Sequence, residues 1–197
     1  MTMTVNGQKA VNGSVHGLFL LVLVMGLTAA AAGCGPKGLA DIRDGLNARG
    51  HYIEAVPFYR QTGHACGPAA LAGVLAFWGR PVSLEDLTAK VVLPKLGGTL
   101  PMDLERAAKD AGFRTTTAHG DRELLRSSVS RNIPVICLLD LGWGPVRQPH
   151  YVTITGYDDG NRLFVMHDGV TRDRTMAYEA YEKTWARAGR WMIVIQP

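Results

Sequence analysis

The sequence lacks any cluster of basic residues, although its formal net charge is +4. Lys and Arg are scattered singly along the chain, a pattern typical of a solvated surface rather than of a patch for nucleic acid or anionic lipid. A phosphate-binding loop is also missing, because "KLGGTLPMD" at 95–103 lacks the Lys-Ser/Thr pair of a Walker motif. We therefore expect no nucleic acid and no ATP as partners, and neither a metal nor a cofactor.

No apolar run reaches the roughly 20 residues that a membrane-spanning helix needs. The longest run, "GLFLLVLVMGLTAAAA" at 17–32, follows a segment whose only charge is Lys9, and it ends in small residues. A short apolar core with a positive residue ahead of it is typical of a secretory signal peptide. Residues 1–33 are therefore predicted to direct the chain out of the cytoplasm.

The letters "AAGC" that end this segment resemble a bacterial lipobox, with cleavage before Cys34 and lipid on its sulfur. One difference is Ala31, where lipoboxes usually have Leu. We predict an extracytoplasmic protein that is lipid-anchored to a bacterial membrane, on the periplasmic side or at the cell surface. A plain signal peptide and an uncleaved anchor are the alternatives. Residues 34–53 would then be a tether, and 54–197 the folded domain.

Within the predicted domain, helical patterns come first and strand patterns follow. Helices are expected from Cys66 to Gly79, from Ser83, over "MDLERAAKDAG" with Gly112 as its stop, and from Asp121 as a cap. Strands are expected at 133–141, 150–159, 162–169 and 190–197, with turns at "DDGN" and "HDGVTR". This order predicts an α+β fold in which helices pack on an antiparallel sheet.

Only three cysteines are present, and Cys66 lies where a loop becomes a helix in "QTGHACGPAALAGVLAFWG". A helix N-terminus favours a thiolate, Gly67 leaves the sulfur unshielded, and Pro68 fits a first helical turn. The alternatives are a packed core thiol and a disulfide with Cys137. Since Cys137 sits inside the apolar strand "ICLLD", we expect it to be buried, inert and a poor disulfide partner.

A nucleophilic thiolate needs a base, and the base needs an orienting group. If 150–159 and 162–169 pair as a hairpin, His150 lies beside Asp168 or His167, which gives a Cys–His–Asp set. His64 is too close to Cys66 on the same loop and is expected at the rim. Gln61, on the entering loop, could form an oxyanion hole with the backbone N–H of Cys66.

These blocks together resemble the papain-like cysteine peptidases that trim double-glycine leaders from bacteriocin precursors, and still more their free-standing relatives among bacterial lipoproteins. The ending "YEKTWARAGRWMIVIQP" is similar to that lipoprotein subgroup, and the resemblance covers about residues 54–197. It implies that Cys66 is the nucleophile, His150 the base, Asp168 the orienting residue and Gln61 an oxyanion-hole donor. Ala65 departs from the Asp that leader peptidases usually carry there.

The expected function is therefore a membrane-anchored, extracytoplasmic thiol protease that cleaves a peptide or protein substrate through a thioester acyl-enzyme. Two other functions fit the same residues: an amidase or acyl transferase with the same triad, and a lipoprotein that binds peptides without catalysis. The intact set of Cys66, His150, Asp168 and Gln61 argues against the last.

Overall fold

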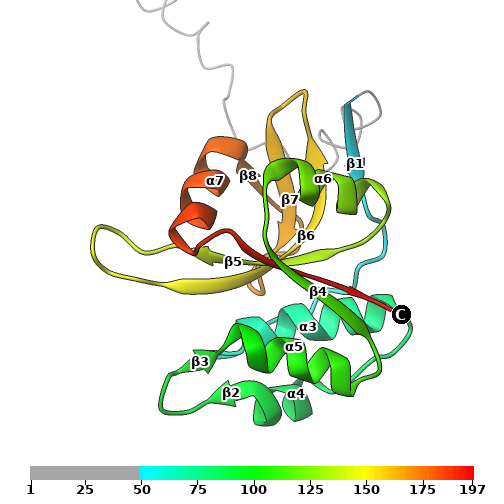
Figure 1. Cartoon of the computed structure of the whole chain (residues 1–197), viewed down its shortest axis with the longest axis vertical. Coiled ribbons are helices and arrows are strands. Elements are labelled where there is room, and N and C mark those ends of the chain that lie inside the picture. The colour runs from blue at the N-terminus through cyan, green and yellow to red at the C-terminus, as the bar shows by residue number, and fades with distance from the viewer. Residues whose placement is uncertain (1–48) are drawn as a thin grey trace, which may run out of the picture. The chain divides into compact units, whose positions relative to one another are not determined.

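A computed structural model of the chain describes residues 49–197, in which there are five helices and nine strands (Figure 1). The predicted signal peptide, the predicted lipidation at Cys34 and most of the predicted tether lie outside the described residues. Among residues 49–197, no helix has the length and apolar character needed to cross a membrane.

The described elements are the helices and strands of an α+β chain. Their bounds are β1 (Gly50–Tyr52), α3 (Cys66–Phe77), α4 (Leu84–Val91), β2 (Val92–Leu93), β3 (Gly98–Thr99), α5 (Pro101–Asp110), β4 (Arg114–His119), α6 (Arg122–Ser130), β5 (Val135–Asp140), β6 (Pro149–Asp158), β7 (Leu163–His167), β8 (Arg174–Ala177), α7 (Tyr178–Arg187) and β9 (Trp191–Gln196).

Seven of the strands form one antiparallel sheet in the order β4-β9-β5-β6-β7-β8, with β1 added along β6. The predicted hairpin of β6 and β7 is confirmed, with Asp158 opposite Leu163. β1 pairs with the far end of β6, where Gly50 lies opposite Asp158. The folded part therefore begins before residue 54, because the last residues of the predicted tether are already a strand of the sheet.

Helices cover both faces of this sheet, as Figure 1 shows with α3, α4 and α5 on one side and α6 and α7 on the other. One core joins α3, α4 and α5 to sheet residues such as Ile136 and Ile193. The other core joins α6 and α7 to the alternate residues, among them Cys137 and Met192. The alternation of side chains along each strand thus supplies two apolar faces, which is why the central strands are buried on both sides.

α3 is the buried helix that the sequence predicts. Every residue from Gly67 to Leu75 is buried, and Trp78 acts as its C-cap. Its small residues let the chain approach closely: a Cβ on Gly73 would lie 2.7 Å from the carbonyl oxygen of Pro57. This close packing fixes the start of the helix, and with it Cys66, against the segment that enters the domain.

The predicted helix start at Ser83 and the predicted cap at Asp121 are confirmed, and both residues act as N-caps. Ser83 accepts a hydrogen bond from the backbone N–H of Asp86 at 3.3 Å, and Asp121 accepts one from Leu124 at 2.8 Å. In both cases a side-chain oxygen satisfies an N–H that has no partner within the helix.

The predicted order of helices first and strands second has exceptions, and two of them are β4 and α7. β4 precedes α6 and pairs with the C-terminal strand β9, from Arg114 opposite Gln196 to His119 opposite Trp191. α7 follows β8 and buries Tyr178, Tyr181 and Trp185 against the sheet. Neither has the long apolar pattern by which the other elements were recognised, because each buries only part of its length.

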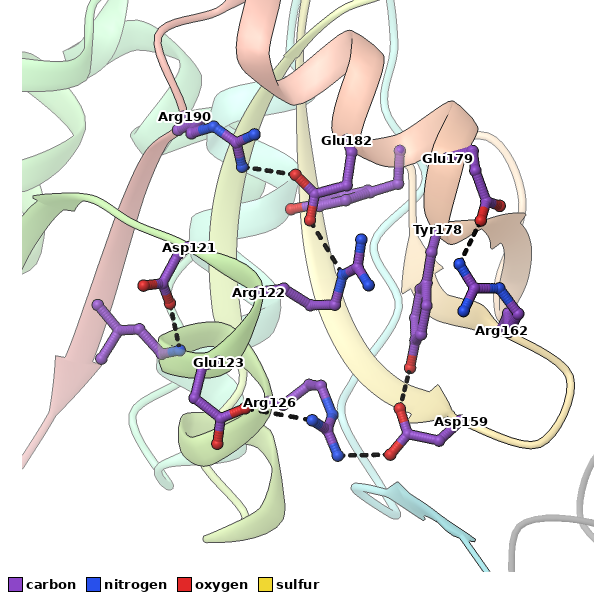
Figure 2. A network of polar contacts seen from close by, with 12 residues as sticks. Asp121, Arg122, Glu123, Arg126, Asp159, Arg162, Tyr178, Glu179, Glu182 and Arg190 are labelled. Carbon is purple, nitrogen blue, oxygen red and sulfur yellow. Dashed lines mark hydrogen bonds and ion pairs between the residues drawn. The ribbon is translucent and has the colours of Figure 1, made fainter.

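A network of charged side chains joins α6, α7 and the turn between β6 and β7 (Figure 2). Glu182 on α7 accepts from Arg122 at 3.1 Å and from Arg190 at 2.5 Å. Asp159 accepts from Tyr178 at 2.8 Å and also from Arg126. These contacts join the helices of one face to the β6–β7 hairpin.

Candidate active site

Cys66 is the first residue of α3 and is half-buried. Burial by itself raises the pKa of its thiol, but hydrogen bonds from the His150 side chain and from the backbone N–H groups of Tyr151 and Gly67 outweigh burial and lower the pKa overall. All of these donors favour the charged form of the sulfur. The site is thus built to hold a thiolate at the end of the helix.

His150 lies near the start of β6, opposite Leu139 of β5. Its Nε2 donates to the main-chain oxygen of Asp168 at 2.8 Å, which leaves Nδ1 for the Cys66 thiol. Burial acts to lower the pKa of His150, but the contact with Cys66 and the nearby Asp168 raise it overall. A lowered thiol pKa beside a raised imidazole pKa favours a thiolate–imidazolium pair.

Asp168 is buried and reaches His150 through its main-chain carbonyl. Its carboxylate is held elsewhere: Oδ1 accepts from the N–H groups of Val170 at 2.8 Å and Thr171 at 2.6 Å, and Oδ2 accepts from Arg174 at 2.8 Å. The carboxylate–imidazole hydrogen bond expected from the sequence is not among the contacts of residues 49–197. The charge of Asp168 nevertheless raises the pKa of His150 from a short distance.

Gln61 packs against the turn that carries Asp168. Its backbone N–H donates to the carbonyl of Gly169 at 2.8 Å, and its Oε1 is buried with no hydrogen-bond partner. Gly169 has a φ of +78°, and a Cβ there would lie 2.6 Å from Gln61 Oε1. The amide of Gln61 therefore packs against the turn that carries Asp168, and Gln61 also lines the cavity at Cys66.

A cavity of about 500 Å³ opens at these residues. Cys66, His150 and Gln61 line it. Its lining also includes Leu96 of the β2–β3 hairpin and Arg147 near the end of the β5–β6 loop. His64 is exposed and lines the same cavity, which agrees with the rim position predicted for it.

Cys137, the remaining cysteine, and His167, the histidine beside Asp168, are both buried within the fold. Cys137 is fully buried, burial raises its pKa to about 12, and both Cys66 and Cys137 are free thiols. The disulfide alternative is therefore wrong for this structure. His167 is buried, its Nε2 contacts the Val56 carbonyl at 3.1 Å, and its Nδ1 accepts from the Asp173 N–H at 3.2 Å.

Two site residues could not be singled out from the sequence. Tyr151 contributes only its backbone N–H to the sulfur, a role that no side-chain pattern indicates. Arg174 reaches the Asp168 carboxylate from β8, a strand that had no recognisable pattern of its own. Among residues 49–197 no group of three or more His, Cys, Asp and Glu side chains could hold a metal ion.

A comparison with protein families matches residues 53–193 to the Peptidase C39 like family. Among solved structures, the peptidase domain of Streptococcus ComA, a bifunctional ABC transporter involved in quorum sensing, is 25% identical, with a TM-score of 0.60, and the match covers 72% of this chain and 98% of that one. No curated protein matches the chain.

Two more solved structures share the fold. One is a C39-like peptidase of Bacillus anthracis, with 19% identity, a TM-score of 0.63, and coverage of 76% of this chain and 98% of that one. The other is a double-glycine-motif protease from an AMS/PCAT transporter in complex with its leader peptide, with 19% identity, a TM-score of 0.60, and coverage of 75% and 94%. The predicted α+β, papain-like architecture is confirmed.

Proposed function

Because this chain belongs to the Peptidase C39 like family and has the fold of its cysteine peptidases, we propose that it cleaves a polypeptide with Cys66 as nucleophile and His150 as general base and acid. The observation that carries the proposal is the pairing of a thiol whose pKa is lowered with an imidazole whose pKa is raised, in the lining of one cavity. Asp168 orients the imidazole, and Gln61 stabilises the oxyanion.

The reaction follows from this placement. The thiolate of Cys66 attacks the scissile carbonyl carbon, a C–S bond forms, and the carbonyl oxygen becomes an oxyanion. Gln61 Nε2 and the Cys66 backbone N–H donate to that oxygen. His150 then gives its proton to the leaving amine, the C–N bond breaks, and a thioester remains. Water, deprotonated by His150, attacks the thioester and releases the acid and the free thiol.

The proposed pair makes a prediction about the pH dependence of alkylation. Since the pKa of Cys66 is lowered, its thiolate persists at a pH where an ordinary thiol is protonated, and iodoacetamide should label it far faster at neutral pH than a free thiol. His150→Ala removes the hydrogen bond but leaves the burial, so the pKa of Cys66 should rise and labelling at neutral pH should slow.

Peptide-resolved mass spectrometry separates label on Cys66 from label on Cys34 and Cys137. The measurement is the labelling rate of Cys66 against pH in the wild type and in His150→Ala. A Cys66 that reacts no faster than a free thiol, with an unchanged profile in the variant, would refute the proposed function. Digestion of a defined peptide library, with Cys66→Ala as control, then identifies the cleaved bonds.

We expect Asp168 to act on His150 through its negative charge and through the turn that places its main-chain carbonyl, rather than through a direct contact of its carboxylate with the imidazole. Asp168→Asn keeps the main-chain carbonyl that holds His150 and an oxygen for the two turn N–H groups, but it loses the charge. We expect turnover to fall about tenfold, which corresponds to about 1.4 kcal/mol. The pKa of His150 should fall as well, and so the alkaline limb of the activity profile should move to lower pH.

Asp159→Asn is the matched control, because Asp159 holds Arg126 and Tyr178 in the network of Figure 2. It should lower the unfolding temperature and leave kcat unchanged. If Asp168→Asn is as damaging as His150→Ala, the carboxylate must bind the imidazole directly during turnover. If it costs nothing, Asp168 has no part in the chemistry.

We also propose that lipid on Cys34 holds the enzyme on the outer side of a bacterial membrane, which is supported by the "AAGC" pattern after an apolar segment. Cys34→Ser should move the protein from the detergent phase to the aqueous phase of a Triton X-114 partition, with unchanged alkylation of Cys66. The protein staying fully in the detergent phase would instead indicate an uncleaved signal anchor.

The substrate is proposed only by class, as a polypeptide. The structure with a bound leader peptide is that of a double-glycine-motif protease. We therefore take a peptide with Gly-Gly ahead of the reactive carbonyl as the first probe of this cavity.

A further inference from the structure

The loop between β5 and β6, residues 141–148 (the arm), ends in residues that line the cavity at Cys66. Figure 1 shows this hairpin projecting from the sheet beyond the helices. Arg147 and Gln148 of the arm line the cavity, as does Pro149, the first residue of β6. The arm therefore contributes to the lining of the space in which a polypeptide would lie.

Beyond its first residue, Leu141, which packs against the core, apolar packing does not hold the arm in place. Its other two large apolar side chains point into solvent, with Trp143 87% exposed and Val146 64% exposed. A loop of this length without a core of its own would ordinarily sample many conformations. The contacts that fix it must therefore be polar.

Asp140, at the base of the arm, supplies those contacts although it is itself only 2% exposed. Its Oδ1 accepts from the backbone N–H groups of Gly142 at 3.0 Å and Gln148 at 2.9 Å, which closes the arm on itself. Its Oδ2 accepts from Arg147 at 2.8 Å and from Arg187 at 3.2 Å. These donors hold the pKa of the carboxyl far below its usual range, so that it remains charged.

Arg187 brings the second half of this clamp from the last turn of α7. Its Nη2 donates to the carbonyl oxygens of Gly144 at 3.4 Å and Val146 at 3.2 Å, near the tip of the arm. Its own carbonyl accepts from Arg147 at 2.6 Å. A single guanidinium thus joins a buried carboxylate to the backbone of an exposed loop, a use for which its several fixed donors are suited.

The clamp does not hold the reacting groups. His150 is placed by the strand pairing of Leu139 with His150 and by the Asp168 carbonyl, and Cys66 is placed by α3. Only the arm depends on Arg187. A change at Arg187 should therefore affect the wall of the cavity and leave the thiolate–imidazolium pair unchanged.

We propose that Asp140 and Arg187 are positioning residues that hold the arm as a preformed wall of the substrate cavity, so that a polypeptide binds without having to order the loop. The proposal rests on the proposed function in one respect, since it takes the cavity at Cys66 to be the substrate site. A preformed wall favours binding because the entropy of ordering the loop is lost on folding rather than on association.

The test compares two alkylating reagents on the same full-length preparations. Iodoacetamide is small and reports the Cys66–His150 pair alone. Ala-Ala-Gly-Gly chloromethyl ketone must also occupy the cavity before the thiolate displaces its chloride and forms the C–S bond. The measured quantity is the ratio of the two second-order rate constants, together with the pH profile for iodoacetamide.

Arg187→Met removes every side-chain donor at similar length, and we expect it to lower this ratio about tenfold by weakening peptide binding. The iodoacetamide rate and its pH profile should stay at the wild-type values. Arg187→Lys keeps one donor for Asp140 but cannot also reach the two carbonyls. Its ratio should lie between those of the wild type and Arg187→Met. Arg187→Lys also serves as the test variant if Arg187→Met does not fold.

Arg122→Met is the matched control, because it breaks a comparable ion pair with Glu182 of α7 that lies in the network of Figure 2 and not on the arm. Its ratio should equal that of the wild type. The inference is overturned if neither Arg187 variant changes the ratio, if iodoacetamide labelling falls in parallel, or if Arg122→Met lowers the ratio equally. Failure of the proposed function looks different: wild-type Cys66 then reacts no faster than a free thiol.

Discussion

Cys66→Ala is expected to reduce peptide cleavage to the background rate, a loss on the order of 10⁵–10⁶ in kcat, because no other group can form the thioester. The fold should survive, since Cys66 is only half-buried and forms no disulfide. Alanine also suits the first turn of a helix. Cleavage of the best library peptide and thermal unfolding of the same sample together test this expectation.

Cys137→Ala is the matched control with the same chemical change at the other free thiol. Cys137 is buried between the sheet and α7, beside Tyr181 and Trp185. Removing its sulfur leaves a small void, so we expect a loss of about 1 kcal/mol of stability with full activity. The opposite pattern, with Cys66→Ala unfolded and Cys137→Ala inactive, would mean that the sequence pattern at Cys66 had been misread.

The fold could be predicted from the sequence wherever an element buries most of its length. α3 is apolar or small all round, and β5 to β7 alternate or run apolar, so their places were recognisable. α7 and β4 carry polar and charged residues on one side, so the apolar pattern of each is weak. The pairing of β4 with β9 joins a strand in the middle of the domain to its C-terminal strand, and the local sequence pattern contains no information about that pairing.

The candidate site divides in the same way. Side chains that carry chemistry, Cys66 and His150, were predicted from motifs and from the β6–β7 hairpin, and the structure brings them together. The contact of Asp168 through its main chain could not be predicted, because sequence does not say which oxygen of a residue faces a neighbour. The clamp of Asp140 by Arg187 depends on α7, which had not been recognised.

Gln61→Ala is expected to lower kcat by about 10²–10³, the usual cost of one oxyanion-hole donor. Its neighbours hold Gln61 in place: its backbone N–H donates to the Gly169 carbonyl, and its Oε1 lies against the same glycine. A donor that acts once the carbonyl carbon is tetrahedral stabilises the transition state more than the substrate, so KM should change little. Steady-state kinetics on the best library peptide measures both constants.

Alkylation separates this role from a merely structural one. Displacement of iodide from iodoacetamide by the Cys66 thiolate passes through no oxyanion, so its rate and pH profile in Gln61→Ala should stay near those of the wild type. Thr62→Ala, an exposed neighbour on the same loop that contributes a backbone carbonyl to Ala65, is the control and should leave both reactions unchanged.

The two rates together decide what Gln61 does. Turnover that falls while alkylation persists means that the thiolate is intact and that only the tetrahedral state has lost a partner. If both fall together, Gln61 positions the loop that leads into α3, and the buried Oε1 against Gly169 is then the contact that matters. If neither falls, the oxyanion is stabilised by backbone donors alone, and the N–H of Cys66 at the helix end is the first of them to examine.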